Sequence, residues 1–78
     1  TIADGQAEAM EFLADKTTRH CGEPLKSLKL KKGVLVVSIV KGARLDIPNG
    51  DSSFHAGDTV YIVTEREKGI CQLNDIFE

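Results

Sequence analysis

The chain has 78 residues, of which 41% are hydrophobic and 28% are charged. This balance is ordinary for one small soluble globular domain and argues against a disordered chain. The net charge of −2 offers no basic face for nucleic acid, and no apolar run reaches the ~18–20 residues that cross a bilayer. We therefore expect neither a nucleic-acid partner nor direct membrane insertion. Because the chain begins with Thr1 rather than Met, residues 1–78 are interpreted as one domain excised from a larger protein.

The first segment with a clear pattern is residues 6–13. Met10 and Phe12 fall on one face of an extended chain and Glu11 falls on the other, which favours a strand. Residues 7–9 would also suit a helix, but the segment is short and lacks a convincing cap. The sequence therefore predicts a strand here.

A polar connection over residues 16–22 leads to a predicted short helix over residues 23–28. Pro24 suits the first turn of a helix, where its missing N–H removes no hydrogen bond. Leu25 and Leu28 are spaced i, i+3 and would be buried together.

The β-branched run at residues 34–40 predicts a central strand that is covered on both faces. A tight hairpin turn is expected at residues 41–44, where Gly42 supplies the positive φ that such turns require. Residues 44–47 alternate polar and apolar side chains and predict a second strand. The Pro-Asn-Gly-Asp sequence at residues 48–51 then predicts a turn.

A further turn at residues 56–58 begins a predicted strand over residues 59–64, and Phe54 is expected in the core. The last segment, residues 65–78, carries an apolar stripe that predicts a helix: Ile70, Leu73, Ile76 and Phe77. The predicted fold class is α+β, a single small domain of order β-α-β-β-β-α. Its mostly antiparallel sheet would be packed with helices.

Four residues could be imagined as a metal site or reactive centre: His20, Cys21, His55 and Cys71. Such a site would require all four to converge. Zinc ligands usually come in pairs separated by about two to five residues, whereas His20 and Cys21 are adjacent. The sequence therefore predicts no metal site, no catalytic residue and no enzyme. Two cysteines are too few for a disulfide framework and fit a reducing cytosolic setting.

Several segments stand in a fixed order along the chain: Pro24-Leu25 with Leu28 and Leu30 before Gly33-Val34, then Ile39-Val40-Lys41-Gly42, Ile47-Pro48-Asn49-Gly50-Asp51 and residues 56–63. In order and spacing these segments resemble the TrkA-C domain, the C-terminal lobe of RCK (regulator of potassium conductance) proteins. The resemblance extends from about Gln6 to Phe77.

The resemblance implies a cytoplasmic regulatory, ligand-sensing and dimerisation domain of a potassium (or other ion or solute) transport protein. The partner would be a membrane transporter or channel subunit, in the same chain or separate, which would hold the domain at the inner face of the cell membrane. The resemblance also implies a homodimer and no cofactor, with a possible nucleotide effector such as cyclic di-AMP. The alternative is a pure dimerisation or assembly module with no small-molecule effector.

By resemblance, the ligand would bind at a dimer cleft near residues 39–42, with neighbours 48 and 49. The candidate ligand-binding residues are Ile39, Val40, Lys41, Gly42, Pro48 and Asn49. The family usually has Arg where this chain has Lys41, and Lys offers a point charge instead of a planar fork, which weakens the case for a nucleotide effector. The alternative for Lys41 and Arg44 is a solvated hairpin end.

Overall fold

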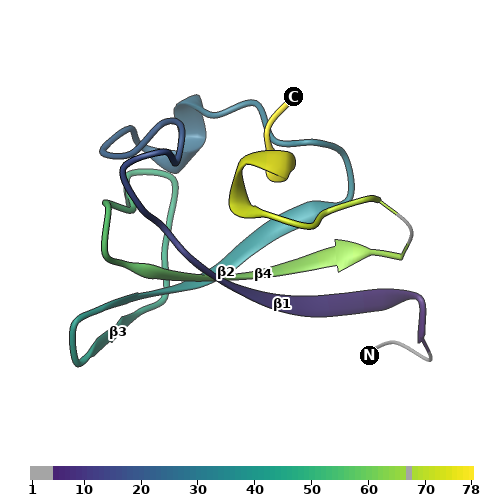
Figure 1. The fold of residues 1–78 in the computed structure, drawn as a ribbon, viewed down its shortest axis with the longest axis horizontal. Helices are drawn as coiled ribbons and strands as arrows, with labels where there is room; N and C mark the ends of the chain where they lie inside the picture. The colour runs from purple at the N-terminus through teal and green to yellow at the C-terminus, as the bar shows by residue number, and fades with distance from the viewer. Residues whose placement is uncertain (1–4, 67) are drawn as a thin grey trace.

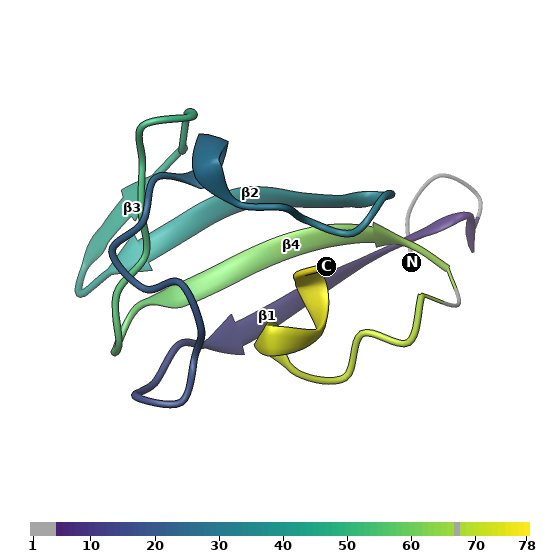
Figure 2. The same ribbon diagram turned by 90° about the horizontal axis from the view of Figure 1, so that it is seen from above.

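The computed structural model describes residues 5–66 and 68–78. One four-stranded antiparallel sheet runs through the molecule in the order β1-β4-β2-β3. Figures 1 and 2 show this sheet as a single twisted layer, with the loops and the two short helical turns on one side of it. The strands are β1 (Ala7–Leu13), β2 (Val34–Lys41), β3 (Arg44–Asp46) and β4 (Thr59–Glu65).

The four predicted strands and the hairpin turn are confirmed. β1 pairs along its whole length with β4, from Ala7 opposite Glu65 to Leu13 opposite Thr59. The alternative of a helix at residues 7–9 is therefore wrong. Between β2 and β3 a two-residue turn contains Gly42 at φ 63°, a left-handed conformation that glycine adopts at little cost.

The predicted α+β class is wrong, because neither predicted helix is an α-helix. In the described residues the helical elements are two short 3₁₀ turns, η2 (Leu25–Ser27) and η3 (Leu73–Ile76). The domain is thus a mostly antiparallel sheet covered on one side by loops and single turns, and not a sheet packed with helices.

At η2, the flanking residues prevent the turn from growing into a helix. Pro24 and Leu28 have ψ values of 139° and 141°, in the extended region on either side of the turn. Beyond Leu28 the chain stays extended, and Leu30 forms an isolated antiparallel bridge with Phe77. Pairing with the C-terminal end therefore takes the place of further helical hydrogen bonds.

At the C-terminal end, the predicted stripe is buried although the helix is absent. Ile70, Leu73, Ile76 and Phe77 are each at most 6% exposed. Spacings of three residues also fit a 3₁₀ turn, which has about 3.0 residues per turn. The Asp75 carboxylate accepts hydrogen bonds from the backbone N–H groups of Cys71 (2.8 Å) and Gln72 (3.0 Å), and this fixes the single turn.

The hydrophobic core lies between the sheet and these covering segments. Its fully buried members come from β2, β4, the loop before β4 and η3: Ile39, Val60, Ile62, Phe54 and Ile76, each 0% exposed. Phe54 reaches the core as predicted, and its ring stacks on Phe77 with the centroids 6.4 Å apart.

β2 is an interior strand, but it is covered on one face and not on both. Val36 points into the core and is 8% exposed, whereas its neighbour Leu35 is 62% exposed on the other face. Within residues 5–66 and 68–78, no helix is long and apolar enough to cross a membrane.

Candidate functional site

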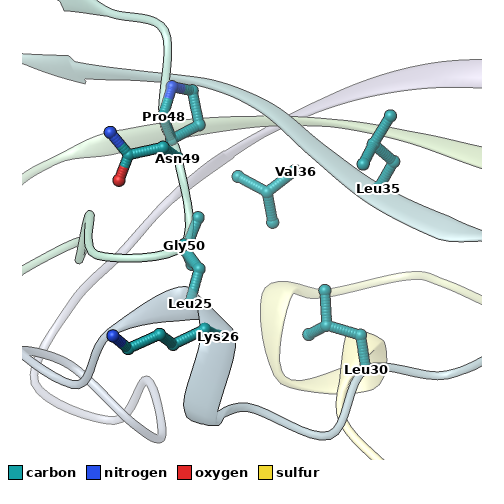
Figure 3. A pocket seen from close by; sticks show the side chains of 8 residues that line it. All are labelled: Leu25, Lys26, Leu30, Leu35, Val36, Pro48, Asn49 and Gly50. Carbon is teal, nitrogen blue, oxygen red and sulfur yellow. The ribbon is translucent and has the colours of Figure 1, made fainter.

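An open groove of about 310 Å³ lies between η2, β2 and the loop that follows β3. The groove is lined by Leu25, Lys26, Leu30, Leu35, Val36, Pro48, Asn49 and Gly50. Figure 3 shows Leu30 pointing toward Val36 from the side of η2, with Pro48 and Asn49 on the opposite loop. Most of its lining is aliphatic, and its volume lies at the lower end of the range of about 300–1,000 Å³ that is usual for ligand pockets.

Backbone hydrogen bonds between η2 and the loop form one wall of the groove. The N–H of Leu25 donates to the carbonyl of Ser52 (2.8 Å), and the N–H of Lys26 donates to the carbonyl of Gly50 (2.9 Å). These donors stand at the start of the 3₁₀ turn, where no preceding carbonyl of the turn can accept them. The loop itself is held by Asn49, whose side-chain oxygen accepts from the N–H of Asp51 (2.8 Å).

The polar groups of the groove stand at its edge. Lys26 is exposed and forms a 2.7 Å ion pair with Asp51, which is also exposed, so this pair contributes little to stability. Asn49 supplies an amide nearby. An aliphatic floor with a cation and an amide at the edge can hold a planar apolar group while pairing an attached anion.

A second cluster joins the end of β2 to the turn before β4. Lys41 Nζ lies 2.6 Å from Asp58 Oδ2, and the same oxygen accepts a hydrogen bond from the backbone N–H of His55 (2.8 Å). The ring Nδ1 of His55 is 3.3 Å from Lys41 Nζ. Asp58 is only 9% exposed. Burial alone would raise the pKa of Asp58, but the bonds from Lys41 and His55 outweigh burial and lower it.

The six residues predicted from the sequence do not form one cluster in a single copy of the domain. Pro48 and Asn49 line the groove. Ile39 is fully buried in the core, and Val40, next along β2, points to the other face of the sheet. Lys41 is held by Asp58. Gly42 stands in the hairpin turn, where a Cβ atom would meet nothing within 4 Å.

Sequence reasoning missed most of the groove. Leu25 and Lys26 lie in the predicted helix and Val36 in the predicted buried strand, and neither these residues nor Leu30 were predicted to line a binding site. One signal was present: the Pro24-Leu25 segment and the Pro-Asn-Gly-Asp turn are both parts of the pattern on which the resemblance rests. The missing fact was that backbone hydrogen bonds join these two segments.

A smaller cavity of about 160 Å³ lies between the end of β1 and η3. Its polar groups already bond to one another: Asp15 accepts from the N–H of Thr17 (2.8 Å), and Asn74 donates to the carbonyl of Thr17 (2.9 Å). In the part of the chain that the structure describes, no three His, Cys, Asp or Glu side chains are placed to hold a metal ion. The larger groove is therefore the candidate ligand site.

Comparison with known proteins gives a consistent result. The family model described as the TrkA-C domain matches residues 9–70. Trk system potassium uptake protein TrkA homolog 1 of Methanosarcina mazei is 39% identical over 62 residues, or 80% of this chain. A TrkA homolog of Archaeoglobus fulgidus is 31% identical over 67 residues, or 86% of the chain. TrkA of Mycobacterium tuberculosis is 31% identical over 71 residues, or 88% of the chain.

These alignments cover only part of each relative. The matched region is 14% of the M. mazei protein, 15% of the A. fulgidus protein and 32% of the M. tuberculosis protein. The similarity thus concerns one domain of longer potassium uptake proteins.

Proposed function

The chain belongs to the TrkA-C domain family, and we propose that it is a regulatory domain of a potassium transport protein that binds a small effector and dimerises. The proposal extends to a cytoplasmic position beside the transporter and to a role without catalysis. Its main support is that the relatives, which match 80% to 88% of the chain, are named as potassium uptake proteins.

We place the effector in the groove between η2 and the loop at residues 48–50. The support is chemical: an aliphatic floor of Leu25, Leu30 and Val36 suits one face of a nucleobase. Lys26 at the edge could pair a phosphate as a point charge. The volume of about 310 Å³ suits one ring system with its attachments. The expected effector is therefore an adenine nucleotide or a cyclic dinucleotide that places one base in each groove.

Thermal melting of the purified domain against a panel of adenine nucleotides and cyclic dinucleotides tests this function. A ligand at about 100 times its Kd adds about 2.7 kcal/mol to the free energy of unfolding. For a domain of this size we expect the melting temperature to rise by more than ~10 °C. A domain that melts at the same temperature with every member of the panel would contradict nucleotide sensing and favour a pure assembly role.

A matched pair of variants tests the position of the effector. Lys26→Ala removes the cation at the edge of the groove, and Lys32→Ala removes another exposed cation that does not line it. We expect Lys26→Ala to raise the Kd of the nucleotide by about tenfold, because it removes one charge-assisted contact. The nucleotide should therefore raise the melting temperature of this variant by less than that of wild type. Lys32→Ala is expected to leave the shift unchanged. Equal effects of the two variants would place the effector elsewhere.

A further inference from the structure

Strand β1 forms one edge of the sheet, and β4 is its one neighbour in the strand order. The register between β1 and β4 is unbroken along all seven residues of β1. Figure 2 shows β1 along one long side of the sheet, and Figure 1 shows the C-terminal segment above this strand, on the core side of the sheet. The outer side of β1 therefore faces away from the domain.

The hydrogen bonds at the two ends of β1 identify the backbone groups that point outward. The N–H of Ala14 donates to the carbonyl of Asp58 (2.8 Å), and the carbonyl of Gln6 accepts from the N–H of Arg66 (3.3 Å). Because alternate residues bond to the partner in an antiparallel pair, the even-numbered residues of β1 bond to β4. The N–H and C=O groups of residues 7, 9, 11 and 13 point outward, and we call these backbone groups the free edge.

The opposite edge of the sheet is much less suited to pairing with another strand. β3 has only three residues, and Pro48 follows shortly after it. Short edge strands and proline are among the usual means by which proteins block pairing at an edge. β1 has seven residues and contains neither proline nor a register shift. The free edge is therefore suited to strand addition, in which an extended segment of a partner continues the sheet.

The side chains of β1 determine the chemistry of an added strand. β1 carries two carboxylates, Glu8 and Glu11, and no Lys or Arg. In the part of the chain that the structure describes, neither carboxylate forms an ion pair, although Glu11 accepts a hydrogen bond from the Tyr61 hydroxyl. Met10 and Phe12 pack against the core but are only partly buried. An added strand is favoured if it places cations opposite the glutamates and apolar side chains opposite Met10 and Phe12.

The same charges disfavour a second copy of β1 as the added strand. An identical strand brings two more carboxylates and no cation, and like charges that face each other across two strands are destabilising. A segment with two cations supplies the missing counter-charges. Because Glu8 and Glu11 are three positions apart, the two cations must also be three positions apart.

We propose that the free edge binds an extended, basic segment of another protein, which adds to the sheet beside β1. Every strand pair in this sheet is antiparallel, and an antiparallel segment reads apolar, basic, apolar, any residue, basic. Its five residues lie opposite residues 12, 11, 10, 9 and 8 in turn. The groove lies at η2, β2 and the loop after β3, so this interface does not depend on the effector proposed above.

Fluorescence anisotropy of a labelled peptide with the 78-residue chain tests the free edge. The probe is a capped peptide with the central sequence Val-Lys-Val-Thr-Lys, flanked by threonines, and the control peptide has Glu in place of each Lys. We expect the Lys peptide to bind and the Glu peptide not to bind. The Kd of the Lys peptide should rise about tenfold or more between ~0.1 M and ~1 M salt, because salt screens exposed charges.

Methylation of single backbone nitrogens in the probe tests strand pairing without a change in the protein. The probe's threonine within Val-Lys-Val-Thr-Lys lies opposite Ala9, so its N–H faces the free edge. The N–H of the valine between the lysine and this threonine faces away. N-methylation of the threonine should raise the Kd about tenfold, because it removes a main-chain hydrogen bond. N-methylation of that valine should change the Kd by less than about threefold.

A double variant of the protein tests the charge selection. Glu8→Gln with Glu11→Gln keeps the size of both side chains and removes both charges, and it should raise the Kd of the Lys peptide about tenfold or more. Circular dichroism should show the fold of wild type. An unchanged Kd in this variant, or equal binding of the Lys and Glu peptides, would overturn the choice of a basic partner.

The remaining outcomes decide the strand addition itself. Equal effects of the two N-methylations would show that the peptide does not pair with the free edge. No binding of the Lys peptide at ~1 mM would overturn the proposal, and Glu8 and Glu11 would then serve to protect the edge against pairing. The nucleotide panel decides effector binding separately, so either proposal can fail without the other.

Discussion

Phe54→Ala is expected to lower the free energy of unfolding by about 3–5 kcal/mol, because it leaves a cavity in the centre of the core. Phe54 is 0% exposed and stacks on Phe77, so few neighbouring groups can move in to fill the space. For a domain of this size that loss lowers the melting temperature by more than ~12 °C. Urea unfolding monitored by circular dichroism measures the change.

Phe54→Leu provides the control for this prediction. Leucine keeps much of the buried volume, and we expect a loss of no more than about 2 kcal/mol. A loss below about 1 kcal/mol in Phe54→Ala would contradict the position of this ring in the core.

Asp58→Ala is expected to destabilise the domain by about 2–4 kcal/mol, because one buried carboxylate accepts bonds from both Lys41 and the His55 backbone. Its loss leaves the His55 N–H without its acceptor and Lys41 without its counter-charge.

Lys41→Met removes only one of the two contacts, and the Lys41 side chain is 32% exposed. It should therefore cost less, about 1–2 kcal/mol. The double variant Lys41→Met with Asp58→Ala measures the coupling between the pair, and strictly additive losses would contradict the ion pair.

The Lys41–Asp58 pair also predicts a dependence of stability on pH. Burial opposes ionisation of Asp58, yet the bonds from Lys41 and His55 prevail and hold its pKa below the ordinary value of 3.8. Because the folded pKa is lower than the unfolded one, the stabilisation is complete above the unfolded value and is lost as the pH falls through the folded value.

Urea unfolding between neutral pH and pH 3 checks this dependence in wild type and in Asp58→Asn. The difference in stability should be constant above about pH 5 and should shrink below about pH 4. Asp15 and Asp75, whose pKa values are also lowered by hydrogen bonds, contribute to both proteins and cancel in the difference. A difference that grows with falling pH would contradict the sign of the Asp58 shift.

The strands could be predicted from the sequence because each carries a local signal. Met10 and Phe12 alternate with polar neighbours, and residues 34–40 are β-branched almost throughout. The helices could not be predicted correctly, since a spacing of three residues is shared by an α-helix, a 3₁₀ turn and a buried irregular segment. The long-range bridge between Leu30 and Phe77 keeps the chain after Leu28 extended instead of helical, and no local sequence pattern indicates this bridge.

The exposed face of β2, which carries Leu35, shows a second limit of sequence reasoning. The apolar run of β2 predicted cover on both faces, and the single chain covers only the face that carries Val36. Apolar patterning indicates that a face will be buried but does not tell whether the same chain or another one buries it.

Only part of the candidate site could be predicted, because a long-range contact completes it. Pro48 and Asn49, which the resemblance gives as neighbours of a ligand, line the groove, but Lys26 joins them only through a backbone hydrogen bond to Gly50. A contact between residues 24 positions apart produces no periodic pattern of residue types in the sequence, so it could not be predicted.

Potassium uptake by the proposed transport protein that would contain this domain is the most direct test of the proposed regulatory role. Leu30→Trp should fill the groove with an indole ring, because Leu30 points across it toward Val36 (Figure 3). We expect the variant protein to assemble normally but to lose the change in potassium uptake that the effector causes in wild type. If the folded variant responds to the effector as wild type does, the groove does not regulate transport.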